Sequence, residues 1–186
     1  MIDDYKLVTG AWLDAIGTIL SAIAEIRAFQ GIDQINNQLV AVGEGLQAVG
    51  TMLVGTVTTD DPLNFAGNWI DGAGAATSSI AAYLQDVEHN TIGEEDLLRL
   101  EILGDSLQAM GASISALADH LIGEHAFAFG NGLQGLGGIL EATGEVYELR
   151  EREGQPLITL GAILQAIGSN FNAVVATREL IEADGL

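Results

Sequence analysis

The chain contains no cysteine and few aromatic residues, and both shortages limit what it can be. Without cysteine, disulfide bonds and thiolate chemistry are excluded, which is compatible with a reducing cytoplasm. Aromatic residues make up only 5% of the chain, although 48% of its residues are hydrophobic. Leu, Ile, Val and Ala must therefore fill the interior, with glycine as a spacer.

Positive charge is also scarce, because six Lys and Arg residues face 26 Asp and Glu residues and leave a net charge of −20. Binding to nucleic acid requires a basic face, so we expect no nucleic-acid partner. Anionic membrane surfaces are disfavoured for the same reason. Residues 1–6 carry two acids where a secretory signal would carry positive charge. We therefore expect no export signal and favour a cytoplasmic location.

Glycine, in contrast, is abundant, and thirteen of the 24 glycines recur at intervals of seven residues. This period returns a side chain to nearly the same face of an α-helix, whereas an odd spacing would alternate between the faces of a strand. Each interior glycine costs a helix about 1 kcal/mol relative to Ala, so we expect close packing of helix backbones in return. The predicted helix-packing residues are Gly10, Gly17, Gly43, Gly50, Gly67, Gly74, Gly104, Gly111, Gly130, Gly137, Gly144, Gly161 and Gly168.

The glycine pattern divides the chain into three similar parts of two helices each. Gly10, Gly67 and Gly130 open related segments that are 57 and 63 residues apart, which predicts internal repeats at about 1–60, 61–122 and 123–186 of a single helical domain. Asp61 and Pro62 are a suitable cap and first residue for a helix, and Gly154 is a suitable stop. We predict helices at roughly 4–28, 34–57, 62–86, 94–120, 124–153 and 156–183.

The predicted fold is therefore all-α, with six antiparallel helices arranged as three pseudo-repeated αα-hairpins that pack closely through Gly/Ala seams. The residues just before each glycine and three residues after it are mostly apolar, so each helix has an apolar ridge between flanks of small residues. A compact bundle of three hairpins satisfies this pattern. A layered stack that continues into a second molecule satisfies it equally well.

A narrow polar stripe remains on each helix. We expect its repeated acids to form a solvated face rather than paired catalytic carboxylates. The repeated glutamines either hydrogen-bond to a neighbouring helix or to another subunit, or they are exposed. The acids are Asp14, Glu44, Asp71, Asp105 and Glu141, and the glutamines are Gln47, Gln108, Gln134 and Gln165.

No segment carries a convincing catalytic, metal or cofactor signature. The histidines are His89, His120 and His125, and the last two lie among acids but lack the spacing of a zinc-binding helix, so we expect a solvated loop there. Residues 130–135 match a dinucleotide-binding pattern by their letters, yet no strand precedes them. Trp12 and Trp69 occupy equivalent repeat positions and are expected to pack inside the protein or to mark a contact surface.

A membrane-spanning chain has to be considered, because the mean hydropathy is positive and residues 155–177 carry no charge. Each of the other predicted helices, however, holds an acid well inside it. A charge at the centre of a membrane helix costs about 2.5–3.5 kcal/mol. We therefore do not expect a protein with six membrane-crossing helices.

The chain resembles a group of uncharacterised repetitive proteins from Bacillus-type Gram-positive bacteria. The resemblance rests on the blocks at 43–50, 104–111 and 161–168, together with the segments at 10–17, 67–74 and 146–150, and it spans nearly the whole chain. It supports the repeats and implies no activity and no catalytic residues. The hosts of such proteins point to a spore or cell-envelope association.

Since nearly all the sequence pattern serves packing, we expect a non-enzymatic structural or interaction protein without cofactor or metal. Its expected partner is a second copy of itself or another protein. The alternative is a protein that binds lipid or another apolar ligand, or that associates with a membrane surface, through its apolar ridges.

Overall fold

The structure, a computed structural model, describes residues 2–87 and 91–185, and the fold of these residues is all-α. The prediction of six helices is confirmed, and the described residues include no strand. The helices are α1 (Ile2–Phe29), α2 (Asn36–Gly55), α3 (Pro62–Val87), α4 (Glu94–Ile122), α5 (His125–Glu148) and α6 (Gln155–Asp184).

The start of α3 follows from its sequence. The side-chain Oδ1 of Asp61 accepts hydrogen bonds from the backbone N–H groups of Leu63 at 3.0 Å and Asn64 at 3.2 Å. Pro62 is the first helical residue, where its missing N–H has no cost. Asp61 is therefore the N-cap that the sequence predicts.

The predicted end of α5 is wrong. This helix ends at Glu148 rather than near residue 153, and Gly154 lies directly before α6 instead of stopping α5. The chain turns at Glu151, which adopts the left-handed conformation with φ of 54°. The backbone N–H of Arg152 then donates to the carbonyl of Tyr147 at 2.9 Å. A non-glycine residue thus makes the turn, which residue preferences do not predict.

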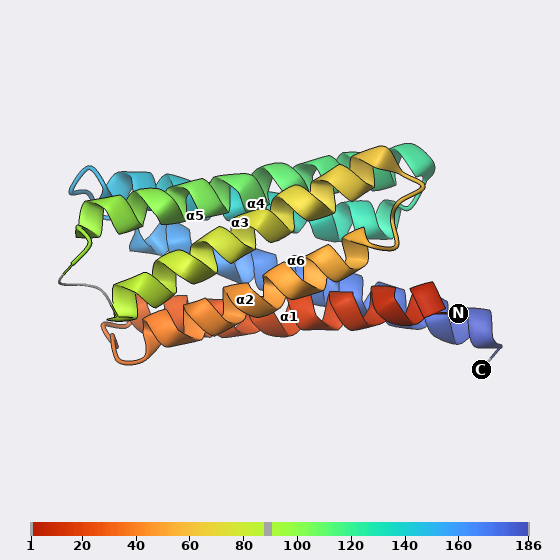
Figure 1. Cartoon of the computed structure of the whole chain (residues 1–186), viewed down its shortest axis with the longest axis horizontal. Helices are drawn as coiled ribbons and strands as arrows, with labels where there is room; N and C mark the ends of the chain where they lie inside the picture. Colours follow the sequence, from red (N-terminus) through yellow and green to blue (C-terminus); the bar gives the residue numbers. More distant parts are fainter. Residues whose placement is uncertain (1, 88–90, 186) are drawn as a thin grey trace.

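The six helices form a closed ring (Figure 1). Among the described residues, each helix contacts the helices before and after it in the chain, α1 also contacts α6, and no helix contacts another across the ring. Both chain termini lie at the same end of this barrel, which we call the near end. The α1–α2 and α5–α6 connections lie at the opposite, far end.

The interior of the barrel is not a conventional apolar core. Every buried apolar residue in the described chain is Ala, except Leu97 and Ile158. The expectation that the polar stripe faces solvent is wrong, because Glu44, Asp105 and Glu141 are only 6%, 8% and 7% exposed. The small side chain of Ala leaves room for polar side chains to meet on the barrel axis.

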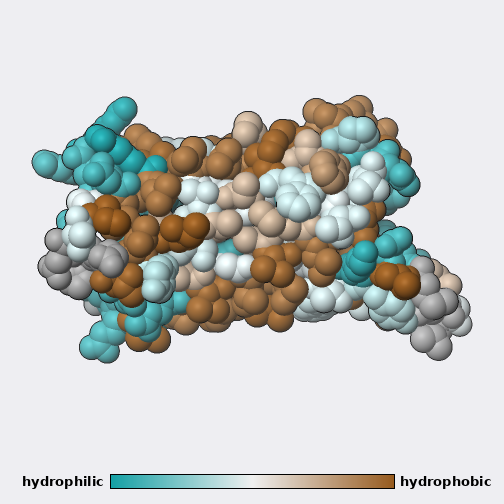
Figure 2. Space-filling model, in the orientation of Figure 1, coloured by the Kyte–Doolittle hydropathy of each residue, from teal (hydrophilic) through white to brown (hydrophobic). Residues whose placement is uncertain are grey.

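The larger apolar side chains lie instead on the outside of the barrel. We call this surface the outer belt, and all six helices contribute to it. In Figure 2, hydrophobic residues form bands along the upper and lower parts of the visible face, paler residues lie between them, and hydrophilic residues gather at both ends. Two exposed residues from each helix illustrate the belt: Ile16, Ile23, Val42, Val49, Trp69, Ile80, Leu103, Met110, Leu136, Ile139, Leu160 and Ile167.

Two helices in the described chain, α1 and α6, are long and apolar enough to cross a membrane by length and composition. In this barrel the inward side of each helix carries polar residues, so the mean hydropathy of a whole helix understates how apolar its outward side is.

Candidate functional site in the polar interior

Three cavities follow one another along the inside of the barrel, and all six helices line each of them. The near chamber, at the near end, has a volume of about 220 Å³, and the far chamber, at the far end, about 200 Å³. A smaller central cavity of about 40 Å³ shares Glu25, Glu101 and Glu145 with the far chamber. The far chamber and the central cavity are therefore adjoining.

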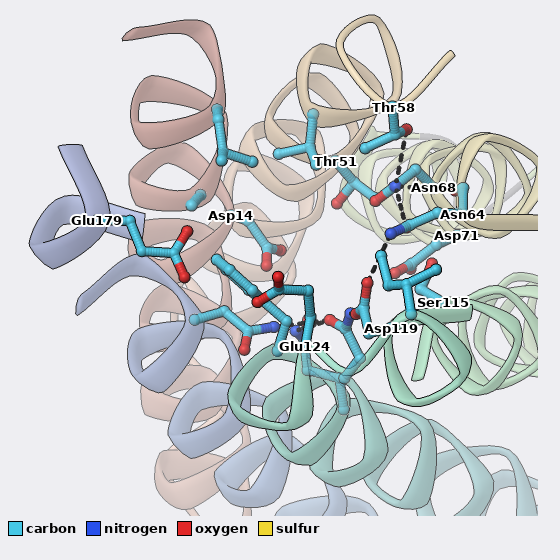
Figure 3. A pocket seen from close by; sticks show the side chains of 18 residues that line it. Asp14, Thr51, Thr58, Asn64, Asn68, Asp71, Ser115, Asp119, Glu124 and Glu179 are labelled. Carbon is cyan, nitrogen blue, oxygen red and sulfur yellow. Dashed lines mark hydrogen bonds between the residues drawn. The ribbon is translucent and has the colours of Figure 1, made fainter. Parts of the chain in front are cut away.

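The near chamber combines carboxylates with side-chain amides, and Figure 3 shows them pointing toward one another. Asp119 accepts a hydrogen bond from the Nδ2 of Asn64 at 2.6 Å and another from the Nδ2 of Asn131 at 2.7 Å. The Nδ2 of Asn172 in turn donates to the Oδ1 of Asn131 at 2.7 Å. Asp14 and Asp71 face the same chamber. Amides from three helices thus converge on Asp119 and the residues beside it.

The central part of the barrel contains what we call the acidic layer: the three carboxylates Glu44, Asp105 and Glu141 with the glutamines Gln47, Gln108 and Gln165. Each two-helix repeat contributes one carboxylate and one glutamine to it. The Nε2 of Gln47 donates to Glu44 at 2.6 Å, and the Nε2 of Gln108 donates to Asp105 at 3.2 Å. Gln165 donates to Glu141 in the third repeat. The pairing therefore recurs around the barrel.

Serine hydroxyl groups complete the first two pairs. Ser21 donates to Glu44 at 2.8 Å, and Ser78 donates to Asp105 at 2.8 Å. Each of these serines lies four residues after a glycine, and in the third repeat Glu141 has this position. Ala162 has the position that Glu44 and Asp105 occupy in the other two repeats. The third repeat has thus moved its carboxylate from one helix of the pair to the other and kept one acid in the layer.

One hydrogen bond links helices that do not touch through their backbones. The Nε2 of Gln108, in α4, reaches the Oε2 of Glu44, in α2, at 3.0 Å. Of the outcomes expected for the repeated glutamines, hydrogen bonding to a neighbouring helix holds for three buried ones: Gln47 donates to Ser21, Gln108 to Ser78 and Gln165 to Glu141. Gln134 is also buried but donates within its own helix, to Asn131 at 3.4 Å.

The interior is strongly acidic and has no basic side chain to balance it. Among the described residues that line the three cavities, none is Lys, Arg or His. Lys6, Arg99 and Arg178 pair with acids within one turn of their own helices, at the exposed ends. A buried charge without a partner costs several kcal/mol. Protons or cations from solution must therefore neutralise the interior carboxylates.

The predicted helix-packing glycines lie between paired helices and do not line the cavities. A Cβ added to Gly50 would lie 2.5 Å from the carbonyl oxygen of Gly10, and one added to Gly74 would lie 2.6 Å from that of Gly104. The same holds in the third repeat, where a Cβ on Gly161 would lie 2.5 Å from the carbonyl oxygen of Gly137. At these positions no side chain fits without moving backbone.

The other candidate positions lie outside the interior. His120 and His125 are exposed at the near end with ring centroids 5.3 Å apart, as expected for a solvated connection. His89 lies outside the described residues. In the described part of the chain, no group of three or more His, Cys, Asp or Glu residues is arranged to hold a metal ion.

The two tryptophans lie on the outer surface near the same end of the barrel. The indole N–H of Trp12 donates to the hydroxyl of Thr177 at 2.9 Å, and the ring of Trp69 lies 6.0 Å from that of Phe65. Both residues are about 40% exposed, so they are not core residues. Residues 130–135, which match a dinucleotide pattern, form part of α5, and Gly130 packs against Asn172.

Sequence reasoning placed the interior acids correctly on one stripe but assigned that stripe to solvent. One sequence pattern could have indicated that these acids are buried. In it, a glutamine follows the acid by three residues, as Gln47 follows Glu44 and Gln108 follows Asp105. Two such pairs at equivalent repeat positions favour a shared interior over independent surface sites.

Comparison with known proteins gives a family without a function. No curated protein and no solved structure matches the chain. A family of unknown function, DUF6944, matches residues 5–173, which is most of the chain. The chain therefore belongs to this family of unknown function.

Proposed function

We propose that the chain is an integral membrane protein, a barrel of six membrane-crossing helices with a lipid-facing belt and a polar interior. The observation that carries this proposal is the inversion of the pattern of water-soluble proteins, because large apolar side chains are exposed while carboxylates and amides are buried. The largest apolar patch of a typical soluble monomer covers about 300–600 Å². An apolar belt round the whole circumference suits acyl chains rather than water.

The distribution of charge supports the same conclusion. Between Lys6 and Arg27 the only charged residues of α1 are Asp14 and Glu25, and both line interior cavities. From Gln155 to Thr177, α6 has no charged residue at all. Acids in membrane helices almost always face the interior of the bundle, as Asp14 and Glu25 do here. The sequence argued against a membrane protein because most helices hold an acid well inside them. Since these acids face the interior of the barrel, that argument no longer applies.

The helix lengths fit a bilayer. The shortest helix, α2, has 20 residues, and the longest, α6, has 30. At about 1.5 Å per residue these helices are about 30–45 Å long. The hydrocarbon core of a bilayer is about 30 Å thick, so each helix is long enough to cross it.

In finer detail, we infer three antiparallel hairpins that pack through Gly/Ala seams. Between membrane helices, close van der Waals packing replaces the hydrophobic effect, and small residues permit it. The glycines that face each other, such as Gly10 with Gly50 and Gly67 with Gly111, have this geometry. Their cost in helix propensity is offset by backbone contact. The function is then structural and transport-related rather than enzymatic.

The alternative is that the outer belt is buried by protein, either a second copy of the chain or another partner. One partner would cover one side of the barrel, whereas exposed apolar residues from all six helices surround it. An apolar ligand held inside is disfavoured because the interior is polar. A groove between α4 and α5, with a volume of about 490 Å³ and lined by residues such as Met110 and Ile139, has the apolar character that a lipid chain requires. We therefore favour lipid as the cover.

The test is the location of the full chain after expression in bacteria. We expect it in the membrane fraction, retained after an alkaline carbonate wash and released only by detergent. A chain that stays soluble and monodisperse without detergent would contradict the proposal. The resemblance to repetitive proteins of Bacillus-type bacteria favours the cell or spore membrane as its natural location, in place of the cytoplasm.

A further inference from the structure

We propose that the barrel interior is a pathway for small monovalent cations, with the acidic layer as its selective constriction. This inference rests on the proposed membrane location. The near and far chambers lie at opposite ends of the barrel, and the central cavity lies between them. A polar interior that extends between the two ends of a membrane barrel is typical of a permeation route.

The sign of the permeant ion follows from the lining. Carboxylates from four helices, α1, α2, α4 and α5, line the central cavity and far chamber, and no basic side chain is among the described residues that line them. Rings of Asp and Glu favour cations in channels and repel anions. The carboxylates of the central cavity are Glu25, Glu44, Glu101, Asp105, Glu141 and Glu145.

Unpartnered acceptor atoms provide a second, independent observation. The Oε1 of Gln108 has no hydrogen-bond partner although this residue is only 2% exposed and its Nε2 is held by Glu44 and Asp105. The Oε2 of Glu145, a residue that lines both the central cavity and the far chamber, is also buried without a partner. A buried acceptor without a donor loses about 1–3 kcal/mol. A cation moving through the interior would be coordinated by these oxygens.

The charge of the permeant ion follows from the geometry. Divalent metal sites in proteins hold the ion by several carboxylate, Cys or His ligands. No described group of three or more such residues has that arrangement. Carboxyl groups from several helices, mixed with amide oxygens and not arranged as a divalent site, suit alkali-metal ions or protons, which bind more weakly and can leave again.

The bond between Gln108 and Glu44 joins α4 to α2 across the barrel. In the proposed pathway it crosses the route of the ion, so this amide would have to turn away for an ion to pass. Gln108 is therefore a positioning residue of the constriction, and Asp105 beside it supplies a carboxyl group to the lining of the central cavity.

The experiment uses the purified full chain reconstituted into vesicles of neutral phosphatidylcholine, with flux of K⁺, protons and chloride measured by separate dyes. Retention of the protein by the vesicles after a carbonate wash is measured on the same sample. We expect K⁺ or protons to cross about tenfold faster than chloride, which corresponds to about 1.4 kcal/mol. The two cation arms tell which of these ions uses the route.

Variants locate the constriction. Asp105→Asn should lower the ratio of cation to chloride flux about tenfold, whereas Asp105→Glu should keep it because the carboxyl group remains. Asp60→Asn, at an exposed connection outside the cavities, is the matched control and should leave the flux unchanged.

Three outcomes would overturn the inference: inserted protein with vesicles as tight as protein-free ones, chloride flux equal to that of the cations, or an Asp105→Asn variant with unchanged selectivity. If the Asp105→Asn variant does not fold, the ratio of cation to chloride flux through the wild-type protein tests the inference by itself. Protein that does not enter vesicles would instead overturn the proposed membrane location.

Discussion

Gly50 and Gly132 illustrate at the scale of single residues how differently two helical glycines can be placed. A Cβ on Gly50 would lie 2.5 Å from both the carbonyl oxygen of Gly10 and the backbone N of Asp14, whereas a Cβ on Gly132 would meet nothing within 4 Å. Both are glycines inside a helix, so both carry the same cost in propensity. Only Gly50 is required by its surroundings.

We predict opposite effects of alanine at these two positions. Gly50→Ala should lower the free energy of unfolding by about 1–3 kcal/mol, because neither contacting atom belongs to a movable side chain. Gly132→Ala should raise it by up to about 1 kcal/mol through helix propensity. Thermal unfolding of both variants in the same detergent checks this pair. Equal shifts for the two variants would show that glycine spacing has no role in packing.

At the same scale, the acids show the limits of a sequence pattern. Asp14, Glu44 and Asp105 recur at regular places, which correctly put them on one stripe of their helices. Whether that stripe faces water or a shared interior depends on what the opposite side of the helix contacts. The exposed Ile and Leu residues of the outer belt decide it, and their exposure is a property of the assembled ring.

At the scale of the elements, most helix bounds were predictable because caps and turn residues act locally. Asp61 caps α3 through two hydrogen bonds that depend on its own and the next three residues. The end of α5 was not predictable, because Glu151 turns the chain in a conformation that glycine usually adopts. Gly154 is buried beside Gly144 in the contact of α5 with α6. Its role is therefore close packing rather than a helix stop.

The outward faces of the helices give a second prediction. Ile16→Lys places a charge on an exposed face in the middle of α1, and at a helix centre in a membrane this costs about 2.5–3.5 kcal/mol. We expect a clear loss of the chain from the membrane fraction, measured by immunoblot. Gln30→Lys, in the exposed connection after α1, should have no effect. If the outer belt faces water, the two lysines will be tolerated equally well.

At the scale of the whole molecule, the closed ring determines what each residue faces. Each helix meets two neighbours, and α6 returns to α1, so there is one inside and one outside. Hydrogen bonds confirm the closure between first and last helices, since the hydroxyl groups of Thr18 and Ser169 lie 2.6 Å apart. Gln155 also donates to the carboxylate of Glu25 at 2.7 Å.

The distribution of basic residues predicts the orientation of the barrel in the membrane. Arg27, Arg99, Arg150 and Arg152 lie at the far end, whereas only Lys6 and Arg178 lie at the near end. Lys and Arg are enriched on the cytoplasmic side of membrane proteins, so the far end should face the cytoplasm.

The absence of cysteine makes this orientation simple to test. Thr59→Cys, in the near-end connection, should react in intact cells with a maleimide that does not cross membranes. Gln30→Cys, at the far end, should react only after the cells are permeabilised. Labelling of Gln30→Cys alone in intact cells would mean that the barrel has the opposite orientation.

The sequence by itself determined the helices and their repetition, because capping, glycine spacing and a period near 3.6 residues act within a few turns of one chain segment. It also determined that acids and glutamines share a stripe, as Glu44 and Gln47 do. Only the tertiary structure decided that this stripe points inward. Ring closure depends on the contact of α1 with α6, which are separated by most of the chain, and no local pattern encodes which side of a helix such a contact will enclose.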